Sequence, residues 1–302
     1  MNQNMRNWMA QAHESFFSLD LKQMDKDLTP REKEEWNLIY ASMRSNSIMH
    51  GEVIGTETVM PNPTDESDAA ENGVLCLVVM AYRVKILIPE TMVWFEGEGR
   101  ERFVLNNMGG AHLEFIVTAI DRPGWCAVAS RTLAMERQRW AATQVSRLTV
   151  GMIIDCRVLA VGPTILTLTA YGYDWTLPAR ALSYSFLGDL RKSYQPGQVL
   201  QARVTSLSDS GIAVSVKDAT PNPYEGAEYR HPVGSIRIGT IISKYKGSIF
   251  VRLTDDCTAV CHYAQQFSDD QFQTDDIVKV QIQSYLDKAQ WLRGKITGKM
   301  SG

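Results

Sequence analysis

Hydrophobic residues recur at two different periods along the chain, and the change of period divides it. Up to about residue 47 they fall at helical spacing. The first apolar stripe consists of Met5, Trp8, Met9, Ala12 and Phe16. From about Ser47 onward, apolar and polar residues alternate in short runs, which is typical of β-strands. The pattern predicts an N-terminal helical arm over residues 1–47, followed by a mainly β protein.

The second helix of the arm has a clear start signal. Thr29 can cap it, Pro30 suits the first helical position, and Glu32 stands where a capping box needs an acid. One face of this helix carries Trp36, Ile39, Tyr40 and Met43. We expect this face to pack on a neighbouring domain. The alternative is a docking arm for a protein partner or for self-association, which exposed Trp and Met would favour.

The β region divides into three strand-rich units. They cover residues 48–131, 148–218 and 232–302, joined by a predicted helix over 132–147 and a proline-punctuated linker over 219–231. Each unit offers five short strands, with one long connection before the closing hairpin. This pattern predicts three tandem five-stranded barrels of the oligonucleotide-binding (OB) type. In the first unit, the segment between Val59 and Gly73 is proline-containing and acidic, and it predicts an exposed loop that repels phosphate.

The closing hairpins of the three units match one another. Their apolar positions are Phe115, Val117 and Ile120; Ala202, Val204 and Leu207; and Val280, Ile282 and Tyr285. Each hairpin turns near an Asp and ends with a small hydroxyl residue near a Lys or Arg. Strand alternation alone would not place an Asp at the turn and a Lys or Arg near the end of all three hairpins. We therefore interpret the units as repeats of one structure.

The third unit resembles the RNA-binding repeat of bacterial ribosomal protein S-one. The matching residues are Tyr245-Lys-Gly247, Phe250-Val-Arg-Leu253, His262, Asp287 and the run from Arg293 to Lys299. It departs from the family pattern by an extra residue between Gly247 and Phe250, by Asp275 in place of a glycine, and by Gly298 in the last motif. The second unit matches at its closing hairpin, and the first there and at Ile88-Pro89.

The resemblance implies single-stranded RNA binding, with bases stacked on aromatic rings beside cationic groups. The implied site consists of Tyr245, Phe250, His262 and Arg293, with Lys244, Lys246 and Arg252 nearby. A stacked base contributes about 1–3 kcal/mol, so a single unit would bind in the micromolar range. The alternative is that Tyr245 and Phe250 are core residues and the lysines form a solvated face.

The first two units lack this set. Pro89 and Pro178 stand at the place of the histidine, and Ile165-Leu-Thr-Leu168 aligns with Phe250–Leu253. Tyr171, Tyr173 and Trp175 lie near a turn of the second unit, where packing is the expected role. We expect these units to act as scaffold or protein-contact modules.

Charge and cysteine content narrow the class of protein. The formal net charge of −3 and a pI of about 6.0 argue against a broad electrostatic grip on duplex DNA. Five scattered cysteines favour a reducing, cytoplasmic location. The longest apolar stretch, from Val74 to Tyr82, is too short to span a bilayer, and the first residues do not form a secretory signal. We therefore expect no membrane association.

Enzymatic and metal-binding motifs are not recognisable. The sequence has no phosphate-cradling loop, no His-Glu-x-x-His and no nucleophile elbow, so we expect neither catalytic residues nor a cofactor. Cys257, Cys261 and His262 do not have the spacing of a zinc knuckle and predict buried cysteines. The paired aspartates, such as Asp269-Asp270, fall in predicted turns.

Two functions remain open from the sequence. The first is a non-enzymatic, single-stranded RNA-binding protein that acts through the third unit. The second is a structural or assembly protein, such as a phage particle component or an adaptor, that uses its divergent barrels and helical arm for protein contacts. The acidic balance and the two units without stacking residues favour the second function.

Overall fold

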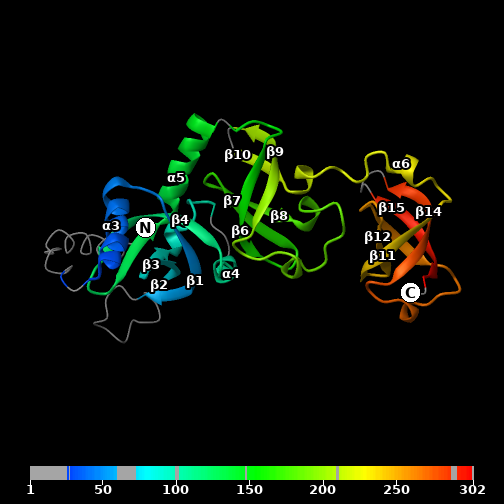
Figure 1. Ribbon diagram of the computed structural model, residues 1–302, viewed down its shortest axis with the longest axis horizontal. Helices are drawn as coiled ribbons and strands as arrows, with labels where there is room; N and C mark the ends of the chain where they lie inside the picture. Colours follow the sequence, from blue (N-terminus) through cyan, green and yellow to red (C-terminus); the bar gives the residue numbers. More distant parts are fainter. Residues whose placement is uncertain are drawn as a thin grey trace.

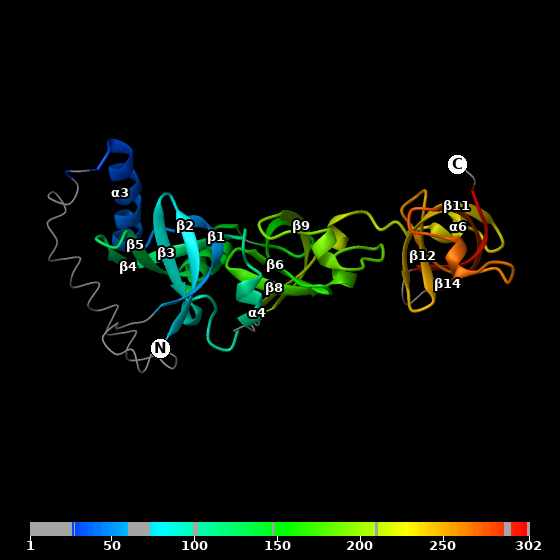
Figure 2. The same cartoon turned by 90° about the horizontal axis from the view of Figure 1, so that it is seen from below.

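The computed structural model of the chain describes residues 26, 28–59, 73–98, 102–146, 148–208, 211–286 and 291–300. Within these ranges fifteen strands form three sheets, which follow one another along the long axis in sequence order (Figure 1). The view from below shows the same order (Figure 2). The fold is therefore mainly β, as predicted. The helical stripe begun by Met5 and most of the acidic loop (residues 60–72) lie outside the described residues.

Helix α3 (Pro30–Ser45) begins at the predicted capping box, which the structure confirms. The backbone N–H of Glu32 donates to Thr29 Oγ1 at 3.3 Å, and the backbone N–H of Thr29 donates to Glu32 Oε2 at 2.8 Å. Trp36 and Ile39 are fully buried in the core of the first unit. The apolar face of α3 therefore covers the first sheet instead of facing a partner.

The first and third units are closed barrels with the same strand order. The first unit has the order β1-β2-β3-β5-β4 and the third has β11-β12-β13-β15-β14. The strands of the first unit are β1 (Met49–Val59), β2 (Val74–Ala81), β3 (Val84–Pro89), β4 (His112–Asp121) and β5 (Cys126–Ser130). Those of the third are β11 (Ile236–Tyr245), β12 (Ser248–Leu253), β13 (Thr258–Tyr263), β14 (Ile277–Leu286) and β15 (Trp291–Lys299).

The second unit is a five-stranded sheet of order β10-β9-β6-β7-β8. Its strands are β6 (Ile153–Val161), β7 (Ile165–Ala170), β8 (Tyr173–Pro178), β9 (Val199–Ser208) and β10 (Gly211–Ser215). The remaining elements are η2 (Glu90–Met92), α4 (Arg102–Asn106), α5 (Arg131–Ala141), the π-helical turn η3 (Ala142–Ser146), η4 (Ala179–Ala181), η5 (Leu190–Lys192), η6 (Lys217–Ala219), α6 (Ala227–Arg230) and η7 (Asp269–Gln271). Helix α5 falls where the sequence predicted a linker helix.

The strand registers show that the units repeat one structure. The first strand of each unit bulges at the same place, after Val53, Val158 and Ile241. The first strand pairs with the fourth strand only before the bulge, and with the second strand on both sides of it. A β-bulge bends the strand and increases its local twist, so that one strand can pair with two neighbours that run in different directions. The bulge therefore fixes which residues are equivalent between the units.

One equivalent position separates the closed units from the open one. It holds Gly51 in the first unit, Gly239 in the third and Cys156 in the second. A Cβ at Gly51 would lie 2.4 Å from Val79 Cγ1, and one at Gly239 would lie 2.7 Å from a backbone oxygen. The closed barrels thus need glycine where the first strand crosses the second.

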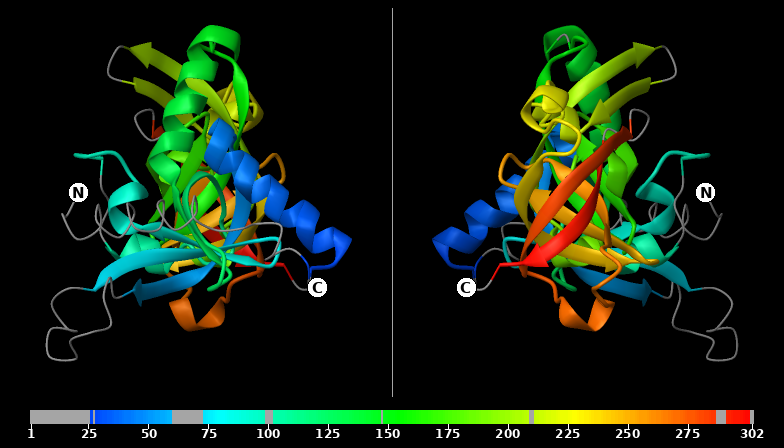
Figure 3. Two further views of the ribbon diagram at one scale, coloured as in Figure 1. Left: turned by 90° about the vertical axis from the view of Figure 1, so that its left-hand side faces the viewer. Right: turned by 90° about the vertical axis from the view of Figure 1, so that its right-hand side faces the viewer.

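The prediction of a closed barrel in the second unit is wrong. Within its described residues, β8 and β10 do not pair, whereas β3 pairs with β5 and β13 with β15 in parallel. The Trp175 side chain fills the space instead, and its indole N–H donates to the Ile212 carbonyl at 2.5 Å. The views along the long axis show the β9–β10 hairpin projecting from the body (Figure 3). Trp175 is therefore a packing residue, as predicted.

A buried ion pair joins the first two units. Arg131, at the start of α5, donates through both terminal nitrogens to Asp174 on β8, at 2.9 and 2.7 Å. The two side chains are only 2% and 3% exposed. The Trp94 indole donates to the same carboxylate, and the Val93 carbonyl accepts from Arg131. The bidentate geometry fixes the orientation of the two units.

Replacing Asp174 should therefore destabilise the protein strongly. We expect Asp174→Ala to lower the free energy of unfolding by about 3–5 kcal/mol, because it leaves the Arg131 charge buried without a counter-charge. Urea unfolding followed by circular dichroism measures the loss. Glu90→Ala is the control, since it removes the exposed pair with Arg102, for which about 0–1 kcal/mol is expected. Equal losses in the two variants would contradict this account.

Candidate nucleic-acid interface

The alternation along β12 and β13 decides which side chains face outward. Ile249 and Val251 point into the barrel and are buried, so Phe250 and Arg252 point away from it. On β13 the inward positions are Ala259 and Cys261, which leaves Val260 and His262 outside. We use "outer face" for the outward side of β11, β12, β13 and β15 in the third unit.

The register aligns the predicted site residues across this outer face. Ser243, Phe250, Val260 and Arg293 form one row over four strands. The neighbouring row places Tyr245 opposite Ser248 and His262 opposite Lys295. The structure thus places Tyr245, Phe250, Arg252, His262 and Arg293 on a single sheet face, and it places Phe250 outside the barrel core.

The cations of the outer face are free of counter-charges. Arg252 and Arg293 are exposed and Lys295 is half-buried, and within the described parts of the chain none of them has an ion-pair partner. Lys246 lies 5.3 Å from the centre of the Tyr245 ring. The described acids of this unit lie instead in turns and loops, where Asp269 and Asp276 pair with lysines. The described charged side chains of the outer face are therefore cationic, although the chain as a whole is acidic.

Lys244 differs from the other predicted cations. Its amine donates to the backbone carbonyls of Asp269 and Phe272, both at 2.7 Å, and pairs with the Asp269 carboxylate. Desolvation lowers the pKa of Lys244, but the bonds to Asp269 outweigh this and raise it above its usual value. Lys244 thus holds the loop before β14 in place and does not project from the outer face.

Phe250 is covered, whereas Tyr245 stays largely exposed although the Phe186 ring also lies near it, with the ring centres 6.2 Å apart and the planes at 34°. The Phe186 ring, from the second unit, stacks on Phe250 with the ring centres 3.9 Å apart and the planes at 15°. The Trp291 ring meets Phe250 edge-on at 5.7 Å. Phe250 is therefore only 6% exposed, while Tyr245 is 53% exposed. This contact was not predicted from the sequence. The only hint in the sequence is the pair of aromatic residues in the Ser183–Phe186 segment, which lies in a predicted connection.

Phe186 belongs to the connection between η4 and η5, residues 182–189, which we call the strap. The Trp291 indole N–H donates to the Tyr184 carbonyl of the strap at 3.2 Å. The Tyr184 hydroxyl donates to Asp218 within the second unit at 2.9 Å. Tyr224, in the linker, lies with its hydroxyl 3.5 Å from the same Tyr184 carbonyl. These contacts bring the strap onto the third unit.

The equivalent face of the first unit cannot serve the same chemistry. Its residues at the places of Tyr245, Phe250, Arg252, His262 and Arg293 are Glu57, Val78, Met80, Pro89 and Val128. They include one acid and no cation. In the second unit Gly162, Thr167, Thr169 and Pro178 take the places of Tyr245, Phe250, Arg252 and His262. The alignment of Ile165 with Phe250 is therefore wrong by two residues, whereas the two prolines do replace the histidine.

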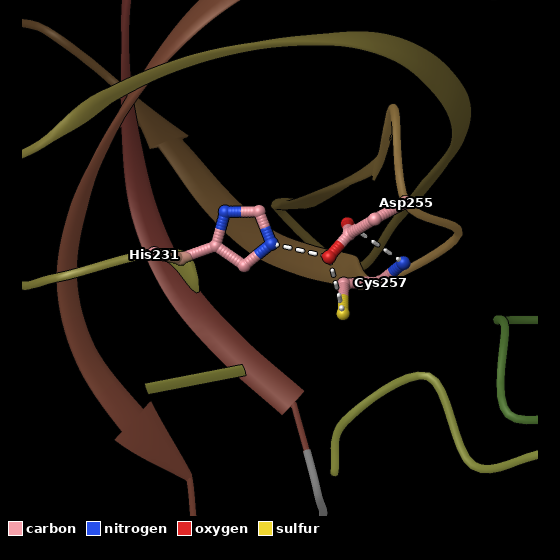
Figure 4. Close-up of side chains that lie close together, drawn as sticks. All are labelled: His231, Asp255 and Cys257. Carbon is pink, nitrogen blue, oxygen red and sulfur yellow. Dashed lines mark hydrogen bonds and ion pairs between the residues drawn. The ribbon is translucent and has the colours of Figure 1, made fainter. Parts of the chain in front are cut away.

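A second side-chain cluster lies where the linker meets the third unit (Figure 4). His231 Nε2 lies 2.7 Å from Asp255 Oδ2, and Cys257 Sγ lies 3.5 Å from the same oxygen. The possible ligand atoms of the three residues all lie within 4.8 Å of one another. The sequence did not indicate this cluster, because its residues come from two segments that only the fold brings together.

The hydrogen bonds of the cluster indicate a structural role and not a metal site. Arg230 already places a cation on Asp255 Oδ2, at 2.9 Å. Arg237 donates to His231 Nδ1, so Nε2 carries the proton and is not a free ligand atom. Burial raises the pKa of Cys257 to about 11, which keeps it a thiol at neutral pH. The cluster therefore fastens the linker to the barrel.

The sequence triple Cys257, Cys261 and His262 does not converge. Cys261 lies in the barrel core, and burial raises its pKa to about 12. His262 is exposed on the opposite side of β13. The prediction of buried cysteines at Cys257 and Cys261 is confirmed.

Comparisons with known proteins give distant similarities. No family model matches the chain. A 4-hydroxy-3-methylbut-2-enyl diphosphate reductase of Clostridium acetobutylicum is 22% identical over 194 residues, which are 62% of this chain and 30% of that protein. The chain thus spans less than a third of the reductase, and the activity of that enzyme is not carried over.

Two solved structures are similar over most of the chain. One is a multidomain protein with nucleic acid binding domains from Streptococcus pneumoniae, at 10% identity and a TM-score of 0.20, covering 84% of this chain and 74% of that one. The other is the CSD456 part of Drosophila Unr, at 10% identity and a TM-score of 0.17, covering 84% and 98%. With TM-scores this low, the function has to be inferred from the residues of this chain. Across its described residues, no helix is long and apolar enough to cross a membrane.

The cluster of His231, Asp255 and Cys257 predicts that Asp255 contributes to the free energy of unfolding in a pH-dependent way. Burial raises the pKa of Asp255, but bonds from Arg230 and His231 outweigh it and hold the pKa below its usual value. A carboxyl with a lowered folded-state pKa stabilises the protein above the unfolded pKa, about 3.9, and loses this contribution as the pH falls through the folded value. Asp255→Asn should therefore lower the unfolding free energy by about 1–3 kcal/mol at pH 7, and the difference should shrink below about pH 4.

Urea unfolding at pH 7 and at acid pH measures this difference. Asp256→Asn is the matched control, because the neighbouring Asp256 is exposed and its left-handed backbone accepts Asn. A deficit for Asp255→Asn of the same size at both pH values would refute the electrostatic role.

Proposed function

We propose that this chain is a non-enzymatic protein that binds single-stranded nucleic acid, in particular RNA, through the outer face of the third unit. The observation that carries the proposal is the coincidence on one sheet face of an exposed ring, Tyr245, with Arg252, Arg293 and Lys295, which have no ion-pair partner among the described residues. Bases stack on aromatic rings while guanidinium and ammonium groups meet the phosphates.

The distribution of charge favours a single strand over a duplex. The chain carries 34 acidic and 31 basic residues, so it has no excess of cations with which to follow a duplex backbone. In the first unit the position of Tyr245 holds Glu57, which pairs with Lys85, so this position offers no stacking ring. A short local surface suits a few nucleotides held by stacking. The expected affinity is in the micromolar range.

Loss of the two guanidinium groups should weaken binding and reduce its salt dependence. Each phosphate contact to a single strand contributes roughly 0.7 to the slope of log K against log salt concentration. The double variant Arg252→Gln, Arg293→Gln should therefore bind more weakly, with a slope reduced by about 1.4. Fluorescence anisotropy of labelled oligoribonucleotides and oligodeoxyribonucleotides at several salt concentrations measures both quantities.

The matched control removes the same charge elsewhere. Arg44 and Arg157 are exposed on α3 and β6, outside the third unit, and Arg44→Gln, Arg157→Gln should leave binding nearly unchanged. Equal loss in the two double variants would mean non-specific attraction and would sink the proposal. Absence of binding in every form, with a stable oligomer in light scattering, would favour the assembly role. The exposed aliphatic residues Ile236, Ile238 and Ile277 on β11 and β14 suit such a role.

A further inference from the structure

The Phe186 ring lies on Phe250 in the geometry that a stacked base would take. The ring centres are 3.9 Å apart and the planes differ by 15°, a nearly parallel contact between residues of two different units. Arg293 lies in the same cross-strand row as Phe250, two strands away, with Val260 between them. The central stacking position of the outer face is thus occupied by the chain itself.

We infer that the strap is an intramolecular cover of the stacking site, and that a single strand gains its contact with Phe250 only when Phe186 moves away. This inference rests on the proposed function and adds its regulation. With Phe186 in place, a strand meets Tyr245 and the cations but not the central ring. With the strap displaced, Phe250 and the edge of Trp291 join the surface.

The cover has a simple physical reason to form. The pleat of β12 forces Phe250 outward, and an exposed Phe ring is costly in water. Phe186 is likewise an apolar residue, and it is half-buried. Stacking hides both rings at once. A nucleobase would hide Phe250 equally well, so a strand competes with Phe186 for the same surface.

The contact between the second and third units is suited to opening. In the described ranges no ion pair links these two units, whereas the first two units share the buried pair of Arg131 and Asp174. The strap is held by ring contacts and by hydrogen bonds to the Tyr184 carbonyl, at 3.2 and 3.5 Å. Tyr224 also bonds Thr258 of the third unit at 2.9 Å, so the linker can stay docked when the strap leaves.

Removing the Phe186 ring should strengthen binding. An aromatic pair contributes about 0.5–1.5 kcal/mol, so Phe186→Ala in the full chain should bind a labelled oligouridylate about two- to tenfold more tightly than wild type. The gain should vanish in Phe186→Ala, Phe250→Ala, because the uncovered ring is then missing.

Phe103→Ala is the control, since Phe103 is 45% exposed in the first unit and should not affect affinity. Circular dichroism and the thermal midpoint establish that each variant is folded. Wild type and Phe186→Ala binding with equal affinity would overturn the cover and leave the proposed function standing. Weaker binding by Phe186→Ala would also overturn it, because Phe186 would then contact the strand. Binding by neither form would refute the proposed function itself.

Discussion

The pleat of β12 and β13 is the constraint from which the proposed binding surface follows. Ile249, Val251 and Cys261 fill the barrel, so the residues between them must face outward. Phe250 and His262 have no freedom to turn inward without exposing core residues. The third unit therefore presents an aromatic ring beside cations as a direct consequence of its core. The same alternation gives the first unit a largely aliphatic face on which Glu57 pairs with Lys85.

The two contacts between units differ in kind. Arg131 and Asp174 form a desolvated, bidentate pair whose geometry allows one arrangement. Phe186 and Phe250 are joined by ring stacking, which has no charge to leave unpaired and is replaceable by another flat ring. The first two units are thus joined by a buried charged pair, whereas the second and third units meet through stacked rings and a hydrogen bond from Trp291.

Much of the fold could be predicted from the sequence, because its signals are local. Alternation predicted the mainly β fold, and Thr29 with Glu32 predicted the start of α3, which the structure confirms. The closure of the second unit could not be predicted. It depends on whether a Cβ fits where two strands cross, and Cys156 stands where the closed units have glycine.

The candidate site could be predicted only in part. The resemblance to the RNA-binding repeat of ribosomal protein S-one supplied Tyr245, Phe250 and His262, and the fold brings them to one face. The strand alignment of the second unit failed by two residues because a period of two is unchanged by such a shift; only the pairing of Val158 with Leu168 fixes the register. The Phe186 contact could not be predicted either, since it joins two units through packing that no local pattern encodes.

Ultraviolet cross-linking of the full chain to oligouridylate, followed by peptide mass spectrometry, tests the central claim most directly. The account predicts adducts on Tyr245 and on the peptides of β12 and β13, residues 248–263. Adducts confined to the first unit or to the β9–β10 hairpin would contradict it.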